Sequence, residues 1–196
     1  MDRTPYMDRF EVVSAPLAGT GGWWPVMDPY DPSFVASLEK QLISRKRELE
    51  DPWCLGFFVD NEIAWGHPTN MAEVVLKCPA EQAAKKHFLS VLKAKYGTIK
   101  ALNKAWGSDY ASWNALAENR KAIKTNDKNR ADFLEFNRGV IHKYYSNIRG
   151  AFDRLAPGVL YMGCRFAGYT PDLVSIGAEY CDVISYNIYD FTLDKV

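Results

Sequence analysis

The sequence predicts an α/β fold built on a parallel sheet, and three apolar segments support this prediction. The run at 54–59 is continuously apolar and bounded by polar residues, as expected of a strand buried on both faces. Similar runs follow at 159–168 and 181–191. Helical patterns separate the three runs, and alternating strands and helices favour parallel strands joined by right-handed crossovers.

The N-terminal part predicts a strand, a loop and a helix. Phe10–Ala15 is expected to be a strand, and the Gly- and Trp-rich segment 19–25 an aromatic loop. Apolar residues at helical spacing then predict a helix from Phe34 to Leu49. Either Asp31 or Ser33 can be its N-cap.

The segment between the first and second apolar runs predicts a long, mostly helical insert. Capping residues, glycine stops and helical spacing of apolar side chains define its helices. They are expected at Ala80–Tyr96, from Thr98 to Trp106, from Asp109 or Ser112 onwards, and at Lys128–Leu155. A further short helix, Thr170–Glu179, is expected between the second and third runs.

Composition narrows the possible partners. The 24 Lys and Arg residues balance the 24 Asp and Glu residues, so no general electrostatic attraction to nucleic acid or an anionic membrane is expected. No apolar stretch reaches the roughly 18 residues of a membrane span, and the N-terminus lacks the apolar region of a signal peptide. The location therefore stays open, with a secreted or periplasmic parent as one option. A nucleotide-binding domain is disfavoured because no Gly-rich phosphate motif follows a strand.

The cysteines predict neither a metal site nor a redox motif. None of the four (Cys54, Cys78, Cys164 and Cys181) belongs to a CxxC pair, and no histidine is spaced for zinc. Buried free thiols are expected, with a disulfide as the alternative. No metal and no cofactor are predicted.

Glu62 is the candidate for chemistry, because it directly follows the first buried strand. Functional groups of parallel α/β barrels lie at the carboxyl ends of the strands. Beside Ile63 and Trp65, the carboxyl is expected to have a raised pKa and so to act as a general acid on a glycosidic oxygen. The structural alternative is a loop glutamate or a helix cap.

Other side chains at the same predicted edge are candidate sugar contacts. Each has a structural alternative: a salt bridge for Arg165, packing for the aromatic residues, a structural role for His67. Asp60 is as readily a structural carboxylate as a substrate contact. High aromatic content, 14%, adds stacking platforms for sugar rings. The substrate-binding candidates are Asn61, Arg165, Asn187, Tyr189, Trp65, Trp24, Trp23 and His67.

Three segments carry a resemblance to retaining glycoside hydrolases of the large (β/α)8 clan. They read DPWCLGFFVDNEIAWG, FLSVLKAKYGTIKALNKAWGSDYASWNAL and LYMGCRFAGYTPDLVSIGAEYCDVISYNIYDF. In order and spacing they resemble β-agarase-like enzymes of glycoside hydrolase family 50, and more distantly family 42 β-galactosidases. The resemblance runs from about Trp24 to the end of the chain.

The resemblance implies roles for individual residues. In that clan the acid/base is the Glu of an Asn-Glu pair after barrel strand four, which here is Glu62, and Asn61 becomes the neighbour that binds a sugar hydroxyl. Arg165, Asn187 and Tyr189 become cleft-lining residues. The implied substrate is a neutral oligo- or polysaccharide, agarose or a related β-galactan.

The resemblance also implies that residues 1–196 form a single domain, part of a catalytic barrel. They would cover about strands three to six of a (β/α)8 barrel, with a helical insert after strand four. Such a barrel takes about 250 residues. The clan's nucleophile, a Glu after strand seven, would lie outside this chain, and Glu179 lies within a predicted helix. A catalytically incomplete, carbohydrate-binding fragment is therefore the alternative to an active hydrolase.

Overall fold

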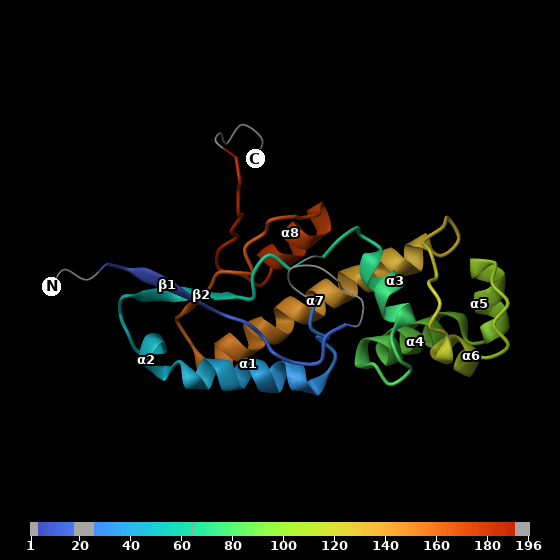
Figure 1. The fold of residues 1–196 in the computed structure, drawn as a ribbon, viewed down its shortest axis with the longest axis horizontal. Helices are drawn as coiled ribbons and strands as arrows, with labels where there is room; N and C mark the ends of the chain where they lie inside the picture. The colour runs from blue at the N-terminus through green and yellow to red at the C-terminus, as the bar shows by residue number, and fades with distance from the viewer. Residues whose placement is uncertain (1–3, 18–25, 64, 191–196) are drawn as a thin grey trace.

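The computed structural model describes residues 4–17, 26–63 and 65–190. Three parallel strands form its sheet in the order β1 (Tyr6–Phe10), β2 (Cys54–Val59), β3 (Leu160–Tyr161). Strand β2 is the predicted first apolar run. Alternation of strands with helical connections is confirmed as the organisation of the chain (Figure 1).

Three of the four predicted strands differ from those in the structure. The N-terminal strand pairs at Tyr6–Phe10 and not at the predicted Phe10–Ala15. The chain leaves the sheet beyond Phe10, because the Val12 N–H donates to the Asp60 side chain and not to a neighbouring strand. The third, expected at 181–191, is reduced within its described part to one parallel bridge between Phe166 and Tyr186.

Strand β3 is also shorter than the apolar run 159–168. Beyond Tyr161 the backbone still bonds to β2, from Val59 N to Gly163 O at 3.0 Å. Gly163 then has a φ of 74°, which turns the chain out of regular pairing. This irregular end brings the following loop beside the end of β2.

The helices follow the sequence signals closely. The described helices are α1 (Pro32–Ser44), α2 (Lys46–Leu49), α3 (Asn70–Lys77), α4 (Ala83–Tyr96), α5 (Ile99–Trp106), α6 (Trp113–Glu118), α7 (Arg130–Leu155) and α8 (Pro171–Ala178). Asp31, Thr98, Ser112 and Thr170 are N-caps whose side chains accept a hydrogen bond from the first turn. Of the paired alternatives, Asp31 and Ser112 are confirmed over Ser33 and Asp109.

Two helix predictions need correction. The helix expected from Phe34 to Leu49 is interrupted at Arg45, whose φ of −101° and ψ of 26° separate α1 from α2. Helix α3 was not predicted, and its N-cap, Thr69, makes no side-chain cap bond. In the described residues, no helix has both the length and the apolar character needed to cross a membrane.

The sheet has one face packed on helices and one open face. Phe57 and Tyr161 are paired neighbours with no exposed surface, and the Tyr161 ring lies 5.2 Å from Phe152 of α7. On the opposite face, Met7, Gly56 and Leu160 form a row in which Met7 and Leu160 are exposed. In a closed barrel this second face is the inner one.

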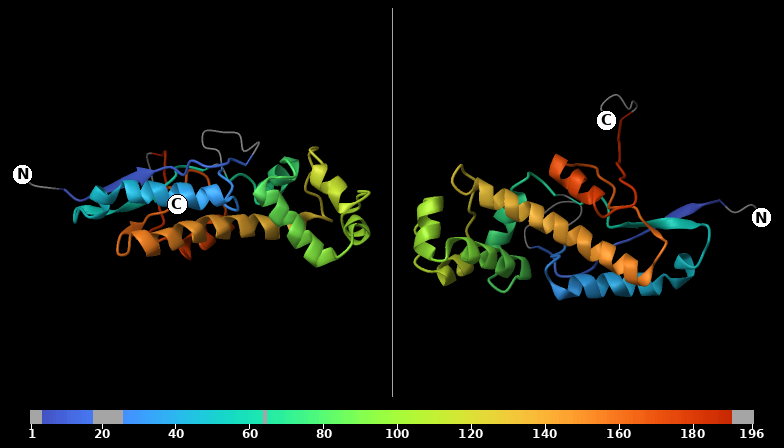
Figure 2. Two further views of the ribbon diagram at one scale, coloured as in Figure 1. Left: turned by 90° about the horizontal axis from the view of Figure 1, so that it is seen from below. Right: turned by 180° about the vertical axis from the view of Figure 1, so that it is seen from behind.

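Helices α1 and α7 run side by side along the sheet, while α3–α6 gather at the far end of α7 (Figures 1 and 2). Inside this insert, buried Asp132 accepts bonds from Lys95, Tyr96 and Trp106 at 2.6–2.7 Å. Buried Trp106 therefore packs in the insert. The insert is thus anchored to α7.

Candidate active site

Glu62 lies just beyond the carboxyl end of β2 and is half-buried. Its backbone N–H donates to the Cys164 carbonyl at 2.9 Å, which joins the ends of the first two apolar runs. Its φ of 49° is left-handed, a conformation that costs a non-glycine residue about 1 kcal/mol or more. The backbone thus holds Glu62 at the edge where functional groups of such folds gather.

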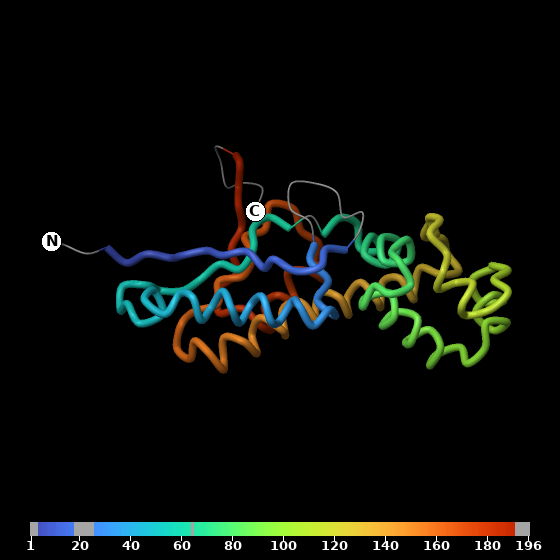
Figure 3. Tube along the Cα trace, turned by 60° about the horizontal axis from the view of Figure 1, so that its bottom comes forward, coloured from blue at the N-terminus to red at the C-terminus, as the bar shows by residue number. Residues whose placement is uncertain are grey.

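Two candidate residues meet Glu62 directly. The Asn187 amide and the Tyr189 hydroxyl both donate hydrogen bonds to Glu62 Oε1. Both donors come from the segment after α8, which extends away from the helices (Figure 3). Asn187 and Tyr189 follow Glu62 by 125 and 127 positions in the sequence, so it is the tertiary fold that brings them to its carboxylate.

The electrostatics of Glu62 contradict the predicted direction. We expected burial to raise its pKa, but the Tyr189 hydrogen bond, followed by the Asn187 bond and the charge of Arg165, holds the pKa of Glu62 below its usual value. The physical reason is that donors aimed at a carboxylate favour its ionised form, and the side chain is too open for desolvation to outweigh them. In this surrounding Glu62 is an anion at neutral pH.

Arg165 lies beside Glu62 in a left-handed conformation of its own, with a φ of 52°. Its guanidinium carbon lies 5.1 Å from the centre of the Phe58 ring, on the strand that leads to Glu62. Its Nε is buried without a protein hydrogen-bond partner. Arg165 therefore contributes positive charge and an unused donor to the site.

Asn61 is 7% exposed, and its Oδ1 is buried without a partner. Buried polar atoms are nearly always paired, so this acceptor, one residue before Glu62, needs a partner that the described residues do not supply. Asn61, Glu62, Arg165, Asn187 and Tyr189 thus form one group at the end of the sheet, which we call the Glu62 group.

Trp65 and His67, the other predicted contacts that the structure describes, do not join the Glu62 group. Trp65 is 4% exposed and packs edge-on against Tyr144, so its predicted role as a sugar platform is wrong: the ring is core. His67 is exposed, and its Nδ1 lies 3.2 Å from Thr69 at the start of α3. Trp23 and Trp24 lie outside the described residues.

Sequence reasoning left one important residue undecided. Asp60 is 9% exposed, and burial raises its pKa to about 6. Its side chain accepts hydrogen bonds from the Val12 N–H and from the Tyr144 hydroxyl, each at 2.7 Å. An aspartate ending a buried strand was the signal, but its partner on α7, 84 residues away, has no local signature.

The cysteines are free thiols, as predicted. Cys78 and Cys164 are buried, and Cys54 and Cys181 are partly so. Burial raises the pKa of Cys164 and of Cys181 to about 12. No group of three His, Cys, Asp or Glu side chains in the described part of the chain is arranged to hold a metal ion.

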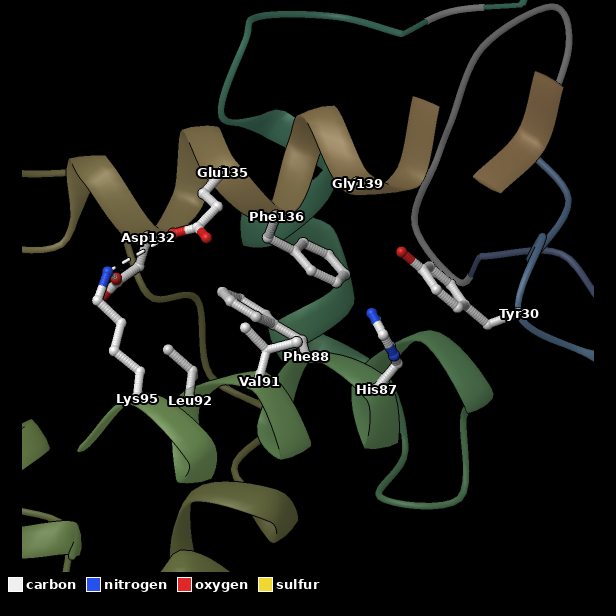
Figure 4. A pocket seen from close by; sticks show the side chains of 10 residues that line it. All are labelled: Tyr30, His87, Phe88, Val91, Leu92, Lys95, Asp132, Glu135, Phe136 and Gly139. Atoms are coloured by element: carbon white, nitrogen blue, oxygen red, sulfur yellow. Dashed lines mark hydrogen bonds and ion pairs between the residues drawn. The ribbon is translucent and has the colours of Figure 1, made fainter. Parts of the chain in front are cut away.

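A separate cavity of about 190 Å³ lies between α4 and α7 (Figure 4). Phe88 and Phe136, stacked at 4.0 Å, form its middle, with Tyr30 and His87 at one end and the Lys95–Asp132 ion pair at the other. Its lining includes no member of the Glu62 group, so the cavity is distinct from the site at the end of the sheet.

Comparisons with known proteins bear on the family and the fold. The family model described as β-galactosidase, glycoside hydrolase family 42, matches residues 34–195. β-Agarase B of Vibrio sp. (strain JT0107) is 36% identical over 189 residues, which cover 87% of this chain and 19% of the relative. β-Agarase A of the same strain is 34% identical with the same coverage. The chain thus spans about a fifth of the length of these curated relatives.

Solved structures agree with these matches. A crystal structure of an agarase is 31% identical with a TM-score of 0.83, covering 94% of this chain and 28% of that one. The structure of an exo-β-agarase is 30% identical with a TM-score of 0.84, covering 94% of this chain and 27% of that one. A β-galactosidase from the psychrophilic Marinomonas ef1, at 20% identity and a TM-score of 0.59, shares the fold.

These matches confirm the expected partial (β/α)8 barrel, since the solved agarases are covered over little more than a quarter of their length. They also confirm the agarase-like resemblance inferred from the strand-end motifs. The family model matches well over half of the sequence, and the chain therefore belongs to the β-galactosidase family of glycoside hydrolases, family 42.

Proposed function

We propose that the chain carries the acid/base centre of a retaining glycoside hydrolase that acts on agarose or a related neutral β-galactan. The observation that carries the proposal is the Glu62 carboxylate at the carboxyl end of β2, contacted by Asn187 and Tyr189. The family match, the β-agarase relatives and the zero net charge support the substrate class.

In the proposed reaction Glu62 donates its proton to the glycosidic oxygen as the bond to the anomeric carbon breaks. A second carboxylate attacks that carbon and forms a covalent glycosyl-enzyme. Glu62, now ionised, takes a proton from water, whose oxygen displaces the second carboxylate. The free Oδ1 of Asn61 is suited to accept a hydrogen bond from a sugar hydroxyl.

The ionised state of Glu62 fits the second step directly, because the residue then acts as a base. The first step requires the proton. A carboxylate about 5 Å away raises the pKa of its neighbour, and retaining enzymes place their two carboxyl groups at about that separation. In the described part of the chain, the charged group acting on Glu62 is Arg165. We therefore expect the negative charge of the nucleophile to raise the pKa of Glu62 in the complete cleft.

The test uses the gene product that contains this chain. Glu62→Gln should lower hydrolysis of agaro-oligosaccharides by at least about 10²-fold, the scale of general acid/base catalysis. Glu179→Gln, a change at an exposed residue just after α8, should leave the rate unaltered. Normal hydrolysis by the Glu62→Gln protein would refute the assignment.

Azide distinguishes an acid/base from a nucleophile at position 62. The substrate is an aryl galactoside whose aryl group leaves without being protonated. With it, azide should restore turnover by Glu62→Ala and give a glycosyl azide of retained configuration, because the covalent intermediate still forms. If Glu62 were the nucleophile, azide would attack the substrate itself and give the inverted product. The lowered pKa of Glu62 makes this second outcome the specific competitor to exclude.

The second candidate function is carbohydrate binding without hydrolysis. It is favoured by one observation, the coverage of about a fifth of the curated relatives. Titration of the chain with neoagaro-oligosaccharides, followed by heteronuclear NMR, separates the two. Binding with no release of reducing ends by the gene product would favour this candidate.

A further inference from the structure

Asp60 connects three parts of the fold immediately before Glu62. Its backbone N–H donates to the Phe10 carbonyl at 2.8 Å, which extends the pairing of β1 with β2. Its Oδ1 accepts from the Val12 N–H, and its Oδ2 accepts from the Tyr144 hydroxyl. One residue thus fixes the end of β2 to the chain leaving β1 and to the middle of α7.

The backbone around Asp60 needs such support. Asp60 has a φ of 60° and Glu62 a φ of 49°, so two residues of one tight turn are left-handed. Conformations of this kind cost about 1–3 kcal/mol each and persist only where neighbouring contacts hold them. At Glu62 the contact is the bond to Cys164, and at Asp60 it is the pair of side-chain bonds.

Asp60 itself is not placed to contact a substrate. Both of its carboxylate oxygens are used by protein donors, and the residue is 9% exposed. The side chain of Glu62, two residues later, is half-exposed and reaches Asn187 and Tyr189. Asp60 therefore holds the turn, while Glu62 in the same turn is open to a ligand.

We infer that Asp60, through its bonds to Tyr144 and Val12, is a positioning residue that holds the left-handed turn and so aims the Glu62 carboxylate at its partners. The inference rests on the proposed function for its catalytic consequence only. The geometry that it explains, the contact of Glu62 with Asn187 and Tyr189, is measurable without any activity.

The charged surroundings of Asp60 are simple. Glu11, beside the exit of β1, is the charged residue that acts on it. The titratable groups packed around Asp60 are neutral at pH 7, since burial raises the pKa of each. They are Tyr144, Tyr145, Tyr161 and Cys164.

Tyr144→Phe is the decisive substitution, because it removes the bond to Asp60 Oδ2 and keeps the ring. Asp60→Asn is the milder change, because asparagine tolerates the left-handed backbone, keeps the shape of the side chain and can still accept from Val12 through Oδ1. The Tyr144 hydroxyl can accept from the new amide and donate to the Val59 carbonyl, 3.4 Å away, so Asp60→Asn reverses the bond without removing it.

The control is Asp28→Asn. Asp28 is also fully buried and accepts three hydrogen bonds, from Tyr30 N, Gln82 Nε2 and Ala84 N at 2.7–2.9 Å. It holds the start of α4 and contacts no member of the Glu62 group. If changing any buried carboxylate disturbs the protein, Asp28→Asn will show it. A change in the position of the Glu62 carboxylate should not occur in this control.

The first readout is the carboxyl ¹³C shift of Glu62 in the full chain at about pH 8, where Asp60 and Glu62 are both ionised. We expect Tyr144→Phe to change this shift, because Glu62 loses contact with its two donors, and Asp60→Asn to change it less. Asp28→Asn should leave it unchanged. An unchanged Glu62 shift in Tyr144→Phe overturns the inference.

The second readout is kinetic, in the gene product that contains the chain. Misplacement of a catalytic group by about 1 Å costs on the order of 10²-fold, so Tyr144→Phe should lower kcat by that factor with little change in KM. A wild-type kcat in this variant also overturns the inference. If Glu62→Gln proves fully active, the proposed function fails, and the Glu62 carboxyl shift alone then decides the positioning role.

Discussion

The buried carboxyl of Asp60 makes the stability of the chain depend on pH in an unusual direction. Most native carboxylates have lowered pKa values, so stability is lost as pH falls. The pKa of Asp60 is instead raised from 3.8 to about 6, because burial outweighs its hydrogen bonds to Val12 and Tyr144. The folded chain binds this proton more tightly than the unfolded chain does.

The sign follows from linkage. A group with a raised folded pKa stabilises the fold less as pH rises, because the folded state must give up a proton that it holds well. The contribution is full below 3.8 and is lost as pH rises toward and past about 6. At about 1.36 kcal/mol per pKa unit, the ionised state of Asp60 costs roughly 3 kcal/mol at pH 7.

Asp60→Asn removes this titration. The free energy of unfolding of the variant minus that of wild type should therefore increase by roughly 2 kcal/mol between pH 4 and pH 7, which means that wild type loses stability and the variant does not. Groups with lowered pKa values, such as Asp31 and Glu73, are common to both proteins and cancel in the difference. Urea unfolding followed by tryptophan fluorescence at several pH values gives the two curves.

Parallel curves for wild type and Asp60→Asn between pH 4 and pH 7 would refute the reasoning. Tyr144→Phe supplies an independent check. It removes a hydrogen bond that favours the ionised carboxylate, so the pKa of Asp60 should rise further. The midpoint of the pH effect should move to higher pH in that variant.

Two further substitutions test the packing that positions the site. Gly56→Ala should lower the free energy of unfolding by about 3 kcal/mol in urea titrations, because the added Cβ would lie 2.3 Å from the Leu160 carbonyl oxygen. Gly168→Ala, with nothing within 4 Å, is the matched control, and an equal loss there would contradict the packing argument. Asp132→Ala should cost about 1–3 kcal/mol and remove hydrogen-exchange protection from α4–α6, since the buried Trp106 indole loses its acceptor. Unchanged exchange in the insert would contradict this role.

Much of the fold was predictable because its signals are local. The apolar run of β2 and the caps Thr98, Ser112 and Thr170 each depend on a few neighbouring residues. Helix α3 was missed because Thr69 begins it without a side-chain cap. The third strand was overpredicted because its apolar run has one described bridge partner.

Strand-end positions and the family resemblance predicted Asn61, Glu62, Arg165, Asn187 and Tyr189 as site residues, and their role in a site stays a prediction. The structure does bring Asn187 and Tyr189 to Glu62. The pKa of Glu62 was predicted in the wrong direction, because its two donors lie more than 120 residues away in the sequence. Local sequence shows the apolar neighbours of a carboxyl but not the donors that tertiary structure brings to it.

Trp65 failed for the same non-local reason. Its position three residues after Glu62 suggested a platform at the cleft, but α7 brings Tyr144 and Tyr145 against its ring. Tyr144 is also the residue that binds Asp60. Tyr144 of α7 therefore packs Trp65 into the core and also binds the turn before Glu62. Neither contact has a local signal in the sequence.

The two carboxyl groups of this turn have pKa values shifted in opposite directions, and each shift follows from what surrounds it. Asp60 is buried and has its pKa raised to about 6, while Glu62 is open, bonded by two donors, and has its pKa lowered. In the proposed mechanism Glu62 must hold a proton before it acts as the acid, so a further negative charge in the complete cleft has to raise its pKa. We assign that charge to the nucleophile, which carries it while ionised and loses it once it is bonded to the sugar. The pKa of Glu62 then falls again, and its carboxylate can take a proton from water as a base. Asn187 and Tyr189 donate to the ionised carboxylate that this second step uses.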